Sequence, residues 1–221
     1  MTIELISTTG FFSLDGEDWE VTNNIWIVGD ESGVVVIDAA HDVHAMIAVL
    51  RGRKVKAILL THGHNDHINA AVPLRDATDA PIFLHEKDLM LWDVVWPEHK
   101  PDYLSLQNDK IAVGAYKINL IHTPGHSPGC CCFYDEKSGV LFSGDTLFCG
   151  GPGATGRSFS SEDEILRSIF TKLLLLPDST IVHTGHGNST EIGKERELIL
   201  ERMHERKMFS VDSRKSEVKL T

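Results

Sequence analysis

Residues 57–67 read Ala-Ile-Leu-Leu-Thr-His-Gly-His-Asn-Asp-His, an apolar strand-like run that leads directly into three histidines and an aspartate. Two histidines spaced two apart on extended backbone project to the same side, so His62 and His64 can reach one metal ion. Once the backbone turns, Asp66 and His67 can face a second ion. The stretch therefore predicts a buried strand that ends in a metal-binding loop.

Three further candidate ligands stand in loops where glycine or proline lets the chain turn sharply. They are His126 in Thr-Pro-Gly-His-Ser-Pro-Gly, Asp145 in Ser-Gly-Asp-Thr, and His186 in Gly-His-Gly. Imidazole and carboxylate ligands of this kind suit Zn, Fe or Mn. A single loop histidine is most often an ordinary surface residue, but this clustering favours a metal site.

The candidate ligands divide naturally between two ions. One ion would take His62, His64 and His126. The other would take Asp66, His67 and His186. Asp145 has two oxygens and can bind both ions, which leaves a position between them for a shared water or hydroxide.

Strand-like and helical segments alternate on both sides of this stretch, which predicts an α/β fold of layered sheets and helices. The expected strands are 24–28, 33–37, 57–60, 81–84, 116–121, 130–134, 140–143 and 180–183, and the main expected helices are 42–50, 161–174 and 194–206. Residues 92–109 read as irregular, and residues 144–156 as a glycine-rich loop. We expect one catalytic domain over residues 1–206 and a polar tail over 207–221.

Composition narrows the possible partners and the compartment. The 221 residues carry 32 acidic and 21 basic side chains, a formal charge of −11, which argues against nucleic-acid binding. The N-terminus lacks the pattern of a signal peptide, and no apolar run is long enough to span a bilayer, so no membrane association is expected. Three of the four cysteines are consecutive and cannot form a disulfide framework, which favours a cytoplasmic protein with reduced thiols. The oligomeric state stays open.

The motifs together resemble the metallo-β-lactamase superfamily from about Asn24 to His186. Within it, Ile121-His-Thr-Pro-Gly-His-Ser127 and Phe142-Ser-Gly-Asp-Thr-Leu-Phe148 are most similar to the glyoxalase II (hydroxyacylglutathione hydrolase) branch. The resemblance implies a four-layer αβ/βα sandwich with the metal site at one edge between the two sheets, and it implies the ligand division above with Asp145 bridging. It also suggests that Asp38 orients the ligands, although a helix cap or turn residue is an equal reading.

The resemblance implies a dinuclear hydrolase in which a metal-bridging hydroxide attacks an acyl carbonyl, most naturally a thioester of a small thiol. Two divalent ions are expected, with Zn favoured over Fe or Mn, and Asp66 and Asp145 are the expected catalytic side chains. Arg157 can meet a carboxylate of the thiol carrier, and a solvated loop arginine is the alternative reading. The carrier itself stays open among glutathione, mycothiol and coenzyme A.

Two other activities fit the same motifs. A persulfide dioxygenase would hold one iron through His62, His126 and Asp145, and the Gly129-Cys130 pair resembles that branch. A lactone or ester hydrolase would direct the same hydroxide at an ester carbonyl.

Overall fold

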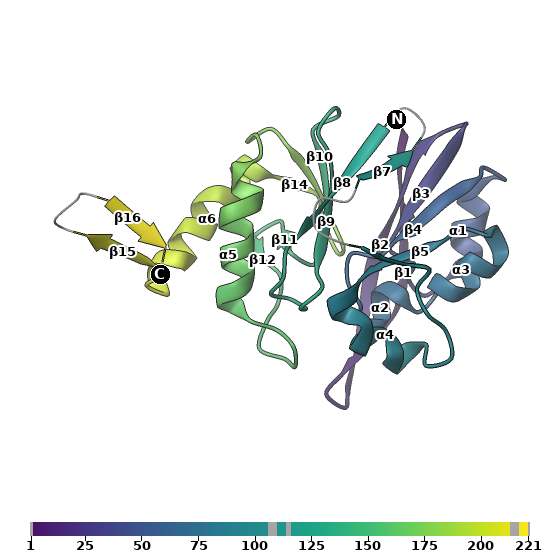
Figure 1. Cartoon of the computed structure of the whole chain (residues 1–221), viewed down its shortest axis with the longest axis horizontal. Helices are drawn as coiled ribbons and strands as arrows, with labels where there is room; N and C mark the ends of the chain where they lie inside the picture. Colours follow the sequence, from purple (N-terminus) through teal and green to yellow (C-terminus); the bar gives the residue numbers. More distant parts are fainter. Residues whose placement is uncertain (1, 106–109, 114–115, 213–216, 221) are drawn as a thin grey trace.

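Two six-stranded sheets form the centre of the computed structural model, which describes residues 2–105, 110–113, 116–212 and 217–220 (Figure 1). The first sheet has the order β1 (Thr2–Leu14), β2 (Glu17–Asp30), β3 (Gly33–Ile37), β4 (Val55–Leu59), β5 (Ile82–His85) and β6 (Tyr103–Ser105). Strands β3 to β6 are parallel to one another, whereas β1 and β2 form an antiparallel hairpin at one edge.

The second sheet has the order β14 (Thr190–Glu191), β13 (Ile181–Thr184), β10 (Val140–Gly144), β9 (Cys131–Asp135), β8 (Tyr116–His122) and β7 (Lys110–Val113). Only β10 and β13 pair in parallel among its described strands. Two small hairpins complete the strands, β11 (Leu147–Phe148) with β12 (Gly151–Pro152) and β15 (Phe209–Asp212) with β16 (Glu217–Leu220).

Helices cover the outer face of each sheet, which gives the expected four layers (Figure 1). The helices α1 (Val43–Leu50), α3 (Ala71–Thr78) and α4 (Leu89–Val95) pack on the first sheet, and α5 (Glu162–Lys172) and α6 (Ile192–Glu205) pack on the second. Alternation along the strands explains this arrangement: Val34 and Val36 of β3 face the helices, while Val35 and Ile37 face the other sheet. Strands buried on both faces read as continuous apolar runs, as 34–37 does.

The candidate ligands lie where strands end. The segments that follow β3, β4, β8, β10 and β13 carry Asp38, His62, His126, Asp145 and His186 respectively. Loops beyond the carboxyl ends of strands are the usual place for sites in α/β sheets. Two backbone hydrogen bonds hold the sheets together at this edge, from Asn24 N to Gly185 O at 2.7 Å and from Cys131 N to Thr61 O at 2.7 Å.

Three sequence predictions need correction. The first strand begins at Thr2, so β1 and β2 form a long hairpin where only 24–28 was expected. Residues 92–109 were expected to be irregular, but α4 continues to Val95 and Tyr103–Ser105 forms β6. Residues 106–109 lie outside the part of the chain that the structure describes. The glycine-rich loop expected over 144–156 contains the β11–β12 hairpin.

No helix in the described part of the chain is long and apolar enough to cross a bilayer.

The seven candidate ligands lie together in one region, between the two sheets.

Candidate metal centre

Three histidines from two loops bring their ring nitrogens together. His62 and His64 follow β4, and His126 follows β8. His64 Nδ1 lies 3.0 Å from His62 Nε2 and 3.0 Å from His126 Nε2. All three side chains are buried. This group corresponds to the first expected ion.

A second group lies beside the first. His67 Nε2 lies 3.2 Å from His186 Nε2 and 3.4 Å from Asp66 Oδ2. The same Asp66 oxygen lies 3.5 Å from His186 Nε2. Asp66 and His67 come from α2 (Asn65–Ile68), whereas His186 comes from the loop after β13.

Asp145 connects the two groups. Its Oδ2 lies 3.5 Å from His126 Nε2 and 3.4 Å from His186 Nε2, and its Oδ1 lies 3.4 Å from His67 Nε2. One carboxylate therefore contacts histidines of both groups. The structure brings the side chains of all seven predicted ligands together, and His62, His67 and Asp145 form a third close group that links the two.

The chemistry of these donors fits divalent cations. His64 Nε2, Asp66 Oδ1 and Asp145 Oδ1 are buried and have no hydrogen-bond partner among the described residues. Three imidazole nitrogens that face one another near 3 Å share too few protons to satisfy every pair. Because unpaired buried polar atoms are costly, a cation among the facing nitrogens and the unpaired oxygens of Asp66 and Asp145 is the natural explanation.

The two groups differ in protonation when no metal is bound. Burial lowers the pKa of His64 to about 3 and holds the pKa of His62 well below its usual value, so both rings are neutral and able to coordinate a metal. Burial also opposes the charge on His67 and His186, but the neighbouring carboxylates outweigh it. They raise the pKa of His67 to about 9 and that of His186 to about 11. Burial opposes ionisation of Asp66 as well, yet the charge on His67 lowers its pKa to about 2.

Asp38 supports His67 from behind. Its carboxylate accepts hydrogen bonds from Thr61 N at 2.8 Å and Thr61 Oγ1 at 2.9 Å, and its Oδ2 lies 2.9 Å from His67 Nδ1. A proton on Nδ1 leaves Nε2 of His67 free to coordinate a metal. Asp38 does not cap α1, because Asp42 does, although Asp38 occupies a turn-like φ of 60°.

Asn23 is a site residue that the sequence did not indicate. Its Nδ2 donates to Asp66 Oδ2 at 2.9 Å and lies 3.2 Å from His67 Nε2. Its Oδ1 lies 2.9 Å from His41 Nε2, so His41, which showed no ligand spacing, joins the site through Asn23. Asn23 lies within β2, and no local motif marks it.

A cavity of about 410 Å³ opens onto the ligands. Its lining residues outside the ligand set are Phe12, Trp19, Val21, Thr22, Ala154 and Arg157. Phe12 and Trp19 of the β1–β2 hairpin stack with ring centroids 5.5 Å apart, and Phe12 also packs edge-on against His64. The aromatic wall therefore comes from the hairpin that the sequence analysis did not predict.

Arg157 lies at the wall of this cavity. Its guanidinium carbon is 3.5 Å from the centre of the Trp19 ring, and its Nη1 is 3.8 Å from Glu17 Oε2. Trp92 and Trp96 do not line this cavity. Their indole nitrogens donate hydrogen bonds to His99 O and Ile68 O respectively.

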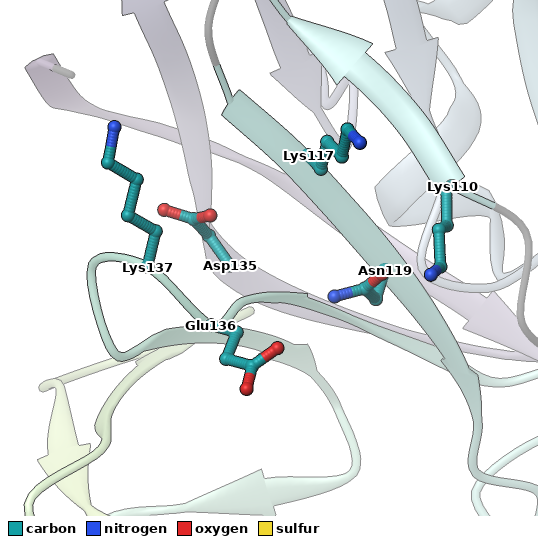
Figure 2. A pocket seen from close by; sticks show the side chains of 6 residues that line it. All are labelled: Lys110, Lys117, Asn119, Asp135, Glu136 and Lys137. Carbon is teal, nitrogen blue, oxygen red and sulfur yellow. The ribbon is translucent and has the colours of Figure 1, made fainter.

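A second hollow lies at the opposite end of β8 and β9 from the ligands (Figure 2). Lys110, Lys117, Asn119, Asp135, Glu136 and Lys137 line it. Its charges are mixed, and it contains none of the metal-ligand groups, so it does not belong to the site.

Comparisons with known proteins agree with this geometry. A family model described as the metallo-beta-lactamase superfamily matches residues 18–186. Hydroxyacylglutathione hydrolase GloC of Haemophilus influenzae is 31% identical over 212 residues, covering 89% of this chain and 95% of GloC.

Two solved structures are similar as well. The B3 metallo-beta-lactamase BLEG-1 is 32% identical, with a TM-score of 0.73 over 86% of this chain and 97% of that one. TTHA1623, solved in a di-iron-bound form, is 34% identical, with a TM-score of 0.68 over 85% and 97%.

Proposed function

Because the chain belongs to the metallo-beta-lactamase superfamily, we propose that this metallo-hydrolase cleaves acyl thioesters of a small thiol and works with two divalent ions. The observation that carries the proposal is the position of Asp145, whose carboxylate contacts histidines of both ligand groups beside an open cavity. The similarity to a hydroxyacylglutathione hydrolase supports the thioester as the substrate class.

Each ligand group would hold one ion. His62, His64 and His126 would bind the first, Asp66, His67 and His186 the second, and Asp145 would contact both. When bound, such ions acidify water and polarise a carbonyl group. Zn is the proposed metal, with Fe or Mn as the alternatives.

The side chains of the site have distinct roles in this proposal. Asp66 keeps one buried oxygen without a hydrogen bond, while Asn23 donates to the other; because its pKa is about 2, Asp66 stays ionised and would act as a ligand and hydrogen-bond acceptor rather than as a strong base. Asp38 holds His67 in one orientation. Phe12 and Trp19 exclude water from one wall of the cavity.

A thioester suits this set of residues because its leaving group needs little help. A thiolate with a reference pKa near ~8.5 departs without a strong general acid. Lysine, a common general acid, does not line the cavity in the described part of the chain.

Arg157 is the proposed contact for the thiol carrier. Trp19 supports its guanidinium, and the distance to Glu17 leaves donors available at the cavity wall. Arginine recognises a carboxylate through paired hydrogen bonds. A carrier with a carboxylate, such as glutathione, is therefore favoured over a neutral thiol such as mycothiol.

A persulfide dioxygenase is the second candidate, because His62 and His126 converge and Asp145 approaches His126. Asp66, His67 and His186 form a further complete ligand group, which favours two ions. The Gly129-Cys130 resemblance is weaker support, because Cys130 is fully buried and its Sγ lies 3.2 Å from Ser127 Oγ.

A substrate panel tests the proposal. Protein stripped by a chelator and reloaded with Zn²⁺, Mn²⁺ or Fe²⁺ would be offered acyl thioesters of glutathione and coenzyme A, a lactone, a β-lactam and a thiol persulfide. We expect thiol release from a thioester as the fastest reaction. Oxygen uptake with the persulfide, without thiol release from any thioester, would overturn the proposal.

A further inference from the structure

Asp88 is a fully buried carboxylate that none of the steps above uses. It ends the short 3₁₀ turn Glu86–Asp88 after β5, and its exposed fraction is 0%. It belongs to none of the three ligand groups. Among the described residues it forms no ion pair with lysine or arginine, and burial raises its pKa, although hydrogen bonds from Ser127, Gly63 and Gly129 oppose this. A buried carboxylate without a cationic partner is costly, so its position calls for a reason.

Its hydrogen bonds connect the two loops that carry the first histidine group. Asp88 Oδ2 accepts from Gly63 N at 2.8 Å, and Gly63 lies between His62 and His64. Asp88 also accepts from Ser127 Oγ at 2.6 Å and from Gly129 N at 2.6 Å, on the loop that carries His126. One side chain thus joins loops more than sixty residues apart in sequence.

The glycines on both loops are explained by the same contact. A Cβ atom at Gly63 would lie 2.9 Å from Asp88 Cβ and 2.9 Å from Leu91 Cβ. A Cβ atom at Gly129 would lie 2.6 Å from Asp88 Cγ. Only glycine lets the two backbones approach Asp88 closely enough for their N–H groups to bond its oxygens.

We propose that Asp88 is a positioning residue that fixes the distance between these two loops and so brings His62, His64 and His126 to one ion. It does not touch metal or substrate. His64 Nδ1 lies 3.0 Å from His62 Nε2 on its own loop and 3.0 Å from His126 Nε2 on the other, so a small change in loop separation moves His126 away from the other two. The inference concerns metal binding and holds for whichever reaction the centre performs.

The main test compares Asp88→Asn with a matched control, Asp135→Asn. Asparagine keeps the shape but turns one acceptor into a donor that faces an N–H or O–H group. Asp135 is equally buried, accepts from Ser138 N and Ser138 Oγ, and lies at the far end of β9 beside the second hollow (Figure 2). The chelator-stripped variants would be titrated with Co²⁺ and Zn²⁺, with the visible spectrum of bound Co²⁺ recorded at each step.

We expect Asp88→Asn to weaken binding of one ion by about 10- to 100-fold, the usual effect of losing a partner behind the ligands. The Co²⁺ spectrum of that ion should change, while the other ion and the Asp135→Asn protein behave as wild type. Wild-type affinities and spectra in Asp88→Asn would overturn the proposal. Equal losses in Asp135→Asn would do so too, because they would show general destabilisation.

Ser127→Ala keeps the test decisive if Asp88→Asn does not fold. It removes one of the three hydrogen bonds to Asp88 and should weaken the same ion by a smaller factor. Unchanged binding of both ions by Ser127→Ala would then contradict the proposal. No step of the titration uses a substrate, so failure of the thioesterase proposal leaves this result unaffected.

Discussion

Replacement of Asp38 by asparagine tests whether the residue behind His67 helps to hold the metal. Asp38 sits at φ 60°, where asparagine is tolerated as well as aspartate, so the change adds no backbone strain. It is 1% exposed, and its two oxygens accept from Thr61 N and Thr61 Oγ1 and face His67 Nδ1. Asparagine has one acceptor oxygen and cannot serve both residues.

The expected loss of metal affinity follows from what a carboxylate does when it holds a ligand histidine in place. Loss of a carboxylate behind a ligand histidine costs about 10- to 100-fold in metal affinity. At about 1.4 kcal/mol for each tenfold change, this equals roughly 1.4–2.8 kcal/mol. The stripped protein should also lose about 1.5–3 kcal/mol of unfolding free energy, because the lost hydrogen bonds involve a charged group.

The assay is a competition titration of chelator-stripped protein with Zn²⁺ against a coloured chelator, with thermal unfolding measured in parallel. Asp42→Asn is the control: Asp42 caps α1, and asparagine caps helices equally well, so metal binding should not change. Wild-type affinity for both ions in Asp38→Asn would refute the role assigned to Asp38, whatever its effect on stability.

Three further predictions concern the bridge, the cavity wall and acid stability. Asp145→Ala should lose metal and lower turnover by at least about 100-fold while circular dichroism shows a folded protein; full metal content and turnover would refute the bridging position. Arg157→Gln should raise KM about 2- to 5-fold, with kcat unchanged, only for thioesters whose carrier has a carboxylate; an equal change for a carrier without one would contradict the contact. Burial lowers the pKa of His183 to about 4, so the unfolded chain binds this proton more tightly. The His183 contribution to stability is therefore complete above pH ~6.5 and is lost as pH falls through 4. The melting temperature of metal-stripped His183→Asn should accordingly fall less than that of stripped wild type between pH ~6.5 and about 4. An equal fall in both proteins would exclude the effect.

The sequence predicted which residues come together at the candidate metal centre because each of them carries its own local signal. His62 and His64 have the spacing of two ligands on extended backbone. Asp145 follows a glycine and His186 lies between two glycines, both at strand ends. The burial of whole strands was also readable, since 34–37 and 57–60 are continuously apolar. These features depend on neighbours in the chain, and sequence patterns record such neighbours well.

The hairpin that forms the cavity wall was missed although one signal exists. Asp15 and Gly16 both have positive φ, and an Asp-Gly pair between strands is typical of a tight hairpin. The strand before it, Thr2–Leu14, has mostly exposed or half-buried residues, so it lacks the apolar run of a buried strand. Phe12 and Trp19 became part of the site only through this pairing.

Asn23 and Asp88 could not be predicted from local patterns. Asn23 meets Asp66 across 43 residues of sequence, and Asp88 meets Gly63 and Gly129 across 25 and 41. A polar residue in a strand or a short turn has many ordinary explanations. Only the packing of the two sheets shows which partners these side chains have.

Stepwise reloading of the chelator-stripped protein, with thiol release from an acyl thioester followed after each addition of Zn²⁺, tests whether this protein is a thioesterase that needs two ions. We expect thiol release to appear on metal addition and to reach its maximum at two ions per chain. A protein that binds a single iron per chain, consumes oxygen with a thiol persulfide and leaves every thioester intact would contradict this expectation.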